Sequence, residues 1–182
     1  MADVDFLAIV LRTVLYVAAF LVAGSAFFAA TVTRDAPFAR ALRWQIGFAV
    51  IVLLAVEIAR WVNFQLTISG GDVALAFSES LAWTAFETPV GHAMAVRVAA
   101  ALGLAIFALS VPAIGVPLAL VLIGSFAVEG HTAGLEGIVR WIAGSLIIVH
   151  LAIASWWFAS FVPLRAATLA PIDGRLPRVT ER

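Results

Sequence analysis

The chain has 182 residues, of which 64% are hydrophobic and only 12% are charged, and its mean hydropathy is +1.10. Soluble domains contain about 45–50% apolar and about 25% charged residues, so a soluble globule of this composition would expose apolar surface that it could not cover. A cytosolic enzyme and a disordered tail are therefore excluded. Eleven basic residues balance eleven acidic ones, which leaves no net charge for binding nucleic acid. The lipid bilayer is the solvent that suits this chain.

The residue types present also limit the chemistry of any metal site. The chain has no Cys, three His and two Met, which excludes disulfides, thiolate sites and iron–sulfur ligation. A metal or haem site would have to be built from these few imidazole and thioether groups together with carboxylates. The sequence holds no Gly-rich phosphate loop and no nucleophile constellation, so we expect a protein that is not an enzyme.

The first half of the chain contains two candidate membrane spans. A transmembrane helix needs about 20 mostly apolar residues, and residues 6–32 and 44–68 meet this requirement. Asp3 and Asp5 stand before the first span, where a signal peptide would carry basic residues, so we interpret this segment as a span. Residues 73–88 alternate apolar with acidic side chains and predict a short interfacial segment.

The second half contains three more candidate spans, over about residues 90–110, 112–128 and 138–162. The middle one is entirely apolar and rather short, and a polar loop separates it from the last. We therefore predict an all-α integral membrane protein, a bundle of about five transmembrane helices plus one interfacial helix, forming a single domain over residues 1–182.

The distribution of arginine predicts the orientation of this bundle, because positively charged loops stay in the cytoplasm. The loop after the first span and the C-terminal tail hold most of the arginines, and five spans place both segments on the same side. The opposite side collects most of the acidic residues. We expect the N-terminus outside and the C-terminus in the cytoplasm.

Four ionisable residues fall inside the predicted spans: Glu57, Arg60, Arg97 and His150. Charges at such positions are costly and usually mark ligand sites or pathways. From the rise of about 1.5 Å per residue, Glu57 and His150 should lie at similar depth, and Arg60 and Arg97 nearer the outer face. Glu57 and Arg60 are three residues apart, so an intramembrane polar network that is only structural is an equally good interpretation. For His150, a lone imidazole at the midplane, we favour a functional role.

Four segments, in this order along the chain, carry a resemblance to a known family. Arg12–Phe27 is similar to the family's opening helix, Glu87–Arg97 to its Thr-x-x-Gly…Arg segment, Phe126–Ala133 to its Ser-Gly-His-Ala motif, and Val149–Trp156 to its His-Leu-x-Ala-x-x-x-Trp helix. The chain thus resembles the copper resistance D (CopD) domain family of bacterial inner-membrane proteins. It departs from the family pattern at Glu129, which replaces the Ser of the third motif.

The resemblance implies a multi-pass protein of the bacterial inner membrane that imports copper or receives it on the periplasmic side. The residues themselves are compatible with this: His131, Glu129 and His92 are expected to form an outer capture site, with Met94 as a thioether ligand and His150 as the next station inward. Imidazole and carboxylate suit Cu(II), and thioether suits Cu(I). The expected partners are the lipid bilayer, a periplasmic copper-binding protein and further copies of the chain.

Two other interpretations stay open. In the first, the protein is a redox subunit in which His92 and His150 ligate a b-type haem or copper within the bundle. In the second, it is a metal-free interaction subunit whose polar residues only set the register of its helices.

Overall fold

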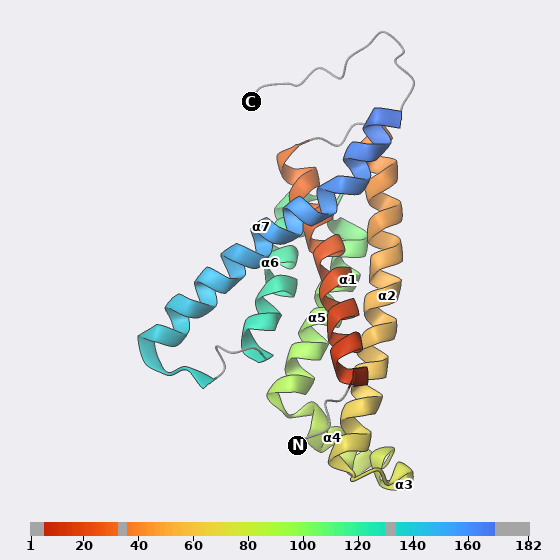
Figure 1. The fold of residues 1–182 in the computed structure, drawn as a ribbon, viewed down its shortest axis with the longest axis vertical. Helices are drawn as coiled ribbons and strands as arrows, with labels where there is room; N and C mark the ends of the chain where they lie inside the picture. The colour runs from red at the N-terminus through yellow and green to blue at the C-terminus, as the bar shows by residue number, and fades with distance from the viewer. Residues whose placement is uncertain (1–5, 33–35, 130–133, 170–182) are drawn as a thin grey trace.

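The structure is a computed structural model that describes residues 6–32, 36–129 and 134–169, and these residues contain helices and no strands. The seven helices are α1 (Phe6–Thr31), α2 (Ala36–Ile68), α3 (Val73–Ala76), α4 (Glu79–Phe86), α5 (Pro89–Phe107), α6 (Pro112–Glu129) and α7 (Gly137–Leu169). Figure 1 shows them as one elongated bundle. The prediction of an all-α membrane protein is confirmed.

The helices follow the predicted spans, with two changes of extent. α2 begins at Ala36 and α7 continues to Leu169, because helical residues extend past the apolar segments that hydropathy detects. Within the described ranges, four helices are long and apolar enough to cross a membrane, namely α1, α2, α5 and α7. α6 is apolar but shorter, so the fourth predicted span, over residues 112–128, is the one whose length falls below this standard.

α1 is the central helix, packed against α2, α6 and α7 and touching α5. Its sequence allows this, because small buried residues such as Ala19, Ala23 and Gly24 let neighbouring helices approach closely. α5 and α6 form an antiparallel pair on one side of α1 (Figure 1). The main core consists of apolar residues from these three helices and from α2.

The predicted interfacial segment forms two short helices, α3 and α4, beyond the end of α2. Gly70 and Gly71 make the turn with positive φ angles of 64° and 86°, a backbone conformation that glycine adopts at little cost. The Asp72 carboxylate then accepts a hydrogen bond from the Leu75 amide at 3.0 Å and caps α3. Thr88 caps α5 in the same way by accepting from the Gly91 amide at 3.1 Å. These turns place the start of α5 beside the end of α2.

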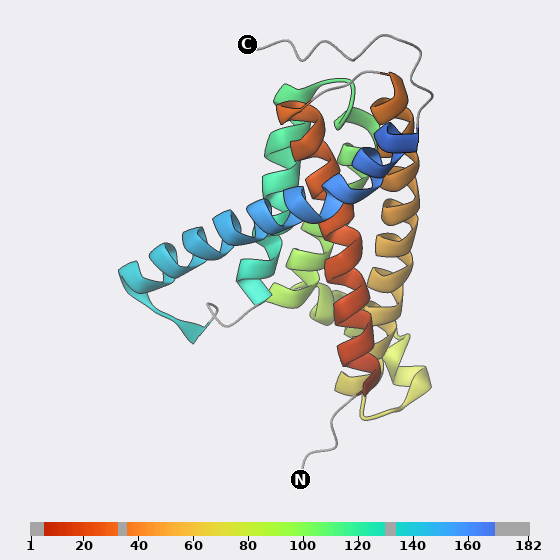
Figure 2. The ribbon, with the colours of Figure 1, turned by 45° about the horizontal axis from the view of Figure 1, so that its top comes forward.

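α7 crosses the bundle obliquely, and its first half points away from the other helices (Figures 1 and 2). Its second half crosses α1 at Gly24, where an added Cβ would lie 1.9 Å from the Ser155 carbonyl oxygen. The Gln45 amide donates to the Ser25 hydroxyl at 2.9 Å and to the Ala159 carbonyl at 3.1 Å beside this crossing. Backbone contact and buried hydrogen bonds therefore hold α1, α2 and α7 together.

Candidate functional site

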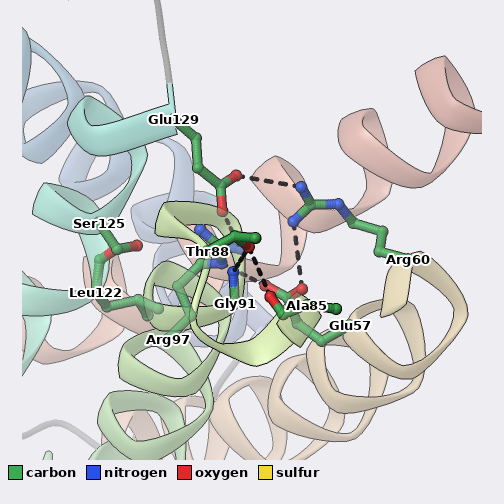
Figure 3. Close-up of polar contacts among 9 residues, drawn as sticks. All are labelled: Glu57, Arg60, Ala85, Thr88, Gly91, Arg97, Leu122, Ser125 and Glu129. Carbon is green, nitrogen blue, oxygen red and sulfur yellow. Dashed lines mark hydrogen bonds and ion pairs between the residues drawn. The ribbon is translucent and has the colours of Figure 1, made fainter. Parts of the chain in front are cut away.

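The four charged residues Glu57, Arg60, Arg97 and Glu129 meet at the end of the bundle where α2 and α6 end and α5 begins (Figure 3). We call these four residues the charge cluster. Glu57 and Arg60 lie one turn apart on α2 and therefore share a helix face. Arg97 comes from α5, and Glu129 is the last residue of α6. The cluster ties together three helices that are far apart in sequence.

The two arginines bridge the two glutamates reciprocally. Arg60 donates from Nη1 to Glu57 and from Nη2 to Glu129, each at 3.2 Å. Arg97 donates from Nε to the other oxygen of Glu57, and from Nη2 to the other oxygen of Glu129 at 2.8 Å. Every oxygen of both carboxylates is thus bound by a guanidinium, and the charges of the four residues cancel.

Burial differs across the charge cluster. The side chains of Arg97 and Glu57 are 0% and 2% exposed, whereas Arg60 and Glu129 are 17% and 15% exposed. The Arg97 guanidinium carbon also lies 5.4 Å from the centre of the Phe126 ring, within cation–π range. Its Nη1 is buried with no hydrogen-bond partner among the described residues. Arg97 and Glu57 therefore form the inner part of the cluster, and Arg60 forms the side closest to solvent or lipid.

A cavity of about 530 Å³ opens against the charge cluster, and we call it the cluster cavity. The four charged residues line part of it, and side chains from α1, α2 and the start of α5 line the rest. These include Arg12, Trp61, Asn63, Phe64, Thr67 and Met94. The walls thus combine aromatic and thioether surface with ionic and amide groups, a composition that is typical of a ligand pocket.

The structure distributes the predicted metal ligands over different places. Glu129 and Met94 line the cluster cavity. His92 is exposed in the first turn of α5, edge-on to Phe86 with ring centres 6.1 Å apart. His150 is exposed on α7 and lines no part of the cluster cavity, and His131 lies outside the described residues. No three His, Asp or Glu side chains of the described ranges gather as a metal site.

The placement of His92 and His150 also bears on the haem interpretation. α5 and α7 make no contact with each other within the part of the chain that the structure describes. Two helices that hold a haem between axial histidines must face each other across it. Because a haem held in this way separates its two helices, the lack of direct contact between α5 and α7 does not decide the question, and the haem interpretation stays a prediction.

The sequence predicts Glu129 as a metal ligand but does not predict its ion pairs with the two arginines. One signal could have indicated it. Glu57, Arg60 and Arg97 together leave one positive charge uncompensated inside the membrane, which is costly. A second carboxylate had to lie nearby, and Glu129 is the next acidic residue along the chain from Arg97.

Comparison with known proteins gives one match. The family model for the copper resistance protein D-like N-terminal domain matches residues 1–141, which include the whole charge cluster. Searches of curated proteins and of solved structures find no match. The match covers well over half of the chain, and with its apolar helices this multi-pass membrane protein belongs to the copper resistance protein D-like family.

Proposed function

We propose that this protein of the bacterial inner membrane takes up copper at the end of the bundle that carries the charge cluster. It then either imports the copper across the membrane or passes it on at the periplasmic side. Copper is the cargo in this proposal, and no reaction is catalysed. The N-terminus and the cluster end face the periplasm, as the arginine distribution predicts. Membership of the copper resistance protein D-like family supports a role in copper resistance. Copper uptake at this end of the bundle is the proposal that we add.

The observation that carries the proposal is that two of the predicted ligands, one thioether and one carboxylate, line a single cavity at one end of the bundle. Met94 and Glu129 line the same cavity, and His92 lies two residues from Met94 on α5. His131 follows Glu129 by two residues in the sequence. Thioether, carboxylate and imidazole are together the ligand types that accept copper in its two oxidation states.

The charge cluster sets a condition on this uptake, because both oxygens of Glu129 are bound by arginine. For Glu129 to bind copper, one guanidinium must release it. Arg60 is the better candidate, since its side chain is 17% exposed and Arg97 is fully buried. We infer that His131 is the first ligand and that Glu129 joins after Arg60 moves.

His150 belongs to a later step in this proposal. It is exposed on α7, away from the cluster cavity, so its imidazole is available to a second copy of the chain or to another protein. A homo-oligomer, or a periplasmic copper-binding protein that docks against the bundle, would bring further ligands to copper.

The test is copper retention by the purified full chain in nanodiscs of phosphatidylcholine. The protein is loaded with Cu(II), or with Cu(I) under ascorbate, desalted and analysed for metal. We expect the wild type to retain copper and His131→Ala to lose at least about 90% of it, because loss of one imidazole ligand weakens a metal site by about tenfold or more. Arg165→Gln, an exposed substitution at the far end of α7, is the matched control.

Retention by the wild type no greater than by empty nanodiscs would contradict the proposal. So would unchanged copper content in both His131→Ala and His92→Ala. A visible absorption spectrum of the same preparation addresses the haem interpretation, because a Soret band would indicate haem in place of copper cargo.

A further inference from the structure

The cluster cavity carries more positive than negative charge. Of the described residues that line it, Arg12, Arg60 and Arg97 are cationic and Glu57 and Glu129 are anionic, so the lining has a net charge of +1. Within the charge cluster, two arginines neutralise two glutamates. The excess positive charge therefore belongs to Arg12, which lines the cavity from α1. Arg12 is exposed and forms no ion pair with the described residues.

The hydrogen-bonding groups of the cavity also favour an anion over a cation. All four carboxylate oxygens are already paired with arginine, so the negative charge of the two glutamates is neutralised and attracts a cation only weakly. The free charged group is the Arg12 guanidinium, and the NH2 of the Asn63 side chain, which has no partner among the described residues, adds further donors. A guanidinium offers two parallel N–H donors that match a carboxylate. The unused chemistry of the cavity is suited to an anion.

The size and walls of the cavity indicate an organic ligand. A volume of about 530 Å³ falls within the range of about 300–1,000 Å³ that small-molecule sites occupy. Trp61 and Phe64 pack against each other with ring centres 6.1 Å apart on one wall, and Met94 lies on another. Such surface gains free energy by covering an apolar body and gains little from a hydrated inorganic ion.

We propose that the cluster cavity binds a small organic anion, with its carboxylate at Arg12 and Asn63 and its apolar body against Trp61, Phe64 and Met94. The anion site itself is independent of copper. Its link to transport rests on the function proposed above: copper would enter this cavity as an anionic chelate of such a ligand. A chelate would also avoid displacing arginine from Glu57 and Glu129 at the moment of entry.

The test uses 2-naphthoate, a non-chelating aromatic carboxylate, and its neutral counterpart 2-naphthalenemethanol. Binding to the full chain in phosphatidylcholine nanodiscs is measured by equilibrium dialysis in EDTA, with empty nanodiscs subtracted. We expect naphthoate to bind saturably and about tenfold more tightly than the alcohol, because a hydrogen bond between a guanidinium and a carboxylate is stronger than one to a neutral hydroxyl. Arg12→Gln should remove this preference, and Arg165→Gln should leave it unchanged.

A second variant tests the location by volume. Met94→Trp should abolish naphthoate binding by filling the cavity, and circular dichroism verifies that this variant is folded. If it does not fold, Arg12→Gln alone decides the question, since that side chain is exposed and outside the charge cluster. Absence of saturable binding, or equal affinities of Arg12→Gln and Arg165→Gln, would overturn the proposal.

Two further results separate this inference from its alternatives. Displacement of naphthoate when phosphatidylglycerol is added to the nanodiscs would overturn the small-molecule assignment and indicate a lipid headgroup. Because EDTA removes copper, naphthoate binding by a protein that retains no copper would support the anion site and contradict only the copper proposal. Copper retention without naphthoate binding would contradict only the anion site.

Discussion

Arg97 shows how a full positive charge can be buried inside an apolar bundle. Its side chain is 0% exposed and contacts both Glu57 and Glu129. Moving an ion out of water costs several kcal/mol, which the attraction between partners offsets only when their hydrogen bonds are well formed. Both glutamates bind both arginines, but Glu57 is the more important partner because its side chain is almost as enclosed as that of Arg97, whereas Glu129 is partly exposed. Its carboxylate keeps α2 and α5 in register.

Glu57→Gln should therefore destabilise the protein strongly. The substitution leaves Arg97 buried with only one carboxylate partner, and breaking a buried pair in this way costs about 3–5 kcal/mol. Arg60→Gln should cost only about 1 kcal/mol, because Arg60 is partly exposed and the remaining cluster keeps its inner pair. The free energy of unfolding, measured by SDS titration from detergent micelles, compares the two variants. Equal losses, or a larger loss in Arg60→Gln, would show that Glu57 is not the central residue of the cluster.

Only part of this cluster was predictable at the residue scale. Glu57 and Arg60 are three residues apart, so their helical spacing alone predicts that they can pair. The contacts of Arg97 and Glu129 depend on which helices are neighbours, and a single sequence does not contain that information. The candidate copper ligands on α5 and α7 and in the loop after α6 stay predictions, because they are tested by binding and not by the positions of helices.

At the scale of the helices, the crossing of α1 and α7 depends on one residue without a side chain. The position of Gly24 leaves no room for a Cβ against the Ser155 carbonyl. Close backbone approach between membrane helices favours dispersion contacts, which replace the hydrophobic driving force that lipid does not supply. The hydrogen bond from the Trp156 indole to the Thr31 hydroxyl at 2.9 Å lies further along the same crossing. Gly24 thus sets the distance between the two helices.

We expect Gly24→Ala to lower the free energy of unfolding by about 1–3 kcal/mol, the usual cost of forcing an extra group into a packed site. Gly47→Ala is the matched control, because a Cβ at Gly47 meets nothing within 4 Å. That change should be neutral or stabilising by up to about 1 kcal/mol, since alanine favours a helix. Thermal unfolding in detergent, followed by circular dichroism, measures both. A Gly24→Ala protein as stable as Gly47→Ala would contradict the close packing of α1 on α7.

The extent of the helices was well predicted where hydropathy decides it, and less well where it does not. The apolar parts of α1 and α5 matched the predicted spans closely. The start of α2 came eight residues earlier than predicted, because Arg40 and Arg43 are good helix formers that a hydropathy criterion excludes. The oblique course of α7 has no signature in its sequence, since tilt depends on packing against neighbours.

At the scale of the whole molecule, the predicted orientation in the membrane can be tested by labelling introduced cysteines. It has no native Cys, so a single introduced thiol gives an unambiguous label. Ser80, on α4, and Ser110, after the end of α5, are both exposed and lie beyond opposite ends of α5.

We expect a membrane-impermeant maleimide to label Ser80→Cys on intact cells, because the acidic end should face outward. Ser110→Cys should react only after the membrane is permeabilised. Gel mobility of the labelled protein reports both reactions, and the Cys-free wild type is the blank. The reverse pattern would place the charge cluster in the cytoplasm and with it the proposed point of copper uptake.

The neutrality of the charge cluster has a consequence for how the protein responds to the electrical potential of the membrane. Moving one elementary charge through 100 mV changes its energy by about 2.3 kcal/mol. Two arginines and two glutamates that shift together feel no net force from this voltage. Release of Glu129 by Arg60 separates opposite charges, so that step alone would become sensitive to the potential. While Arg60 holds Glu129, the cluster has no net charge for the membrane potential to act on, so the potential acts only on the step that separates these two residues.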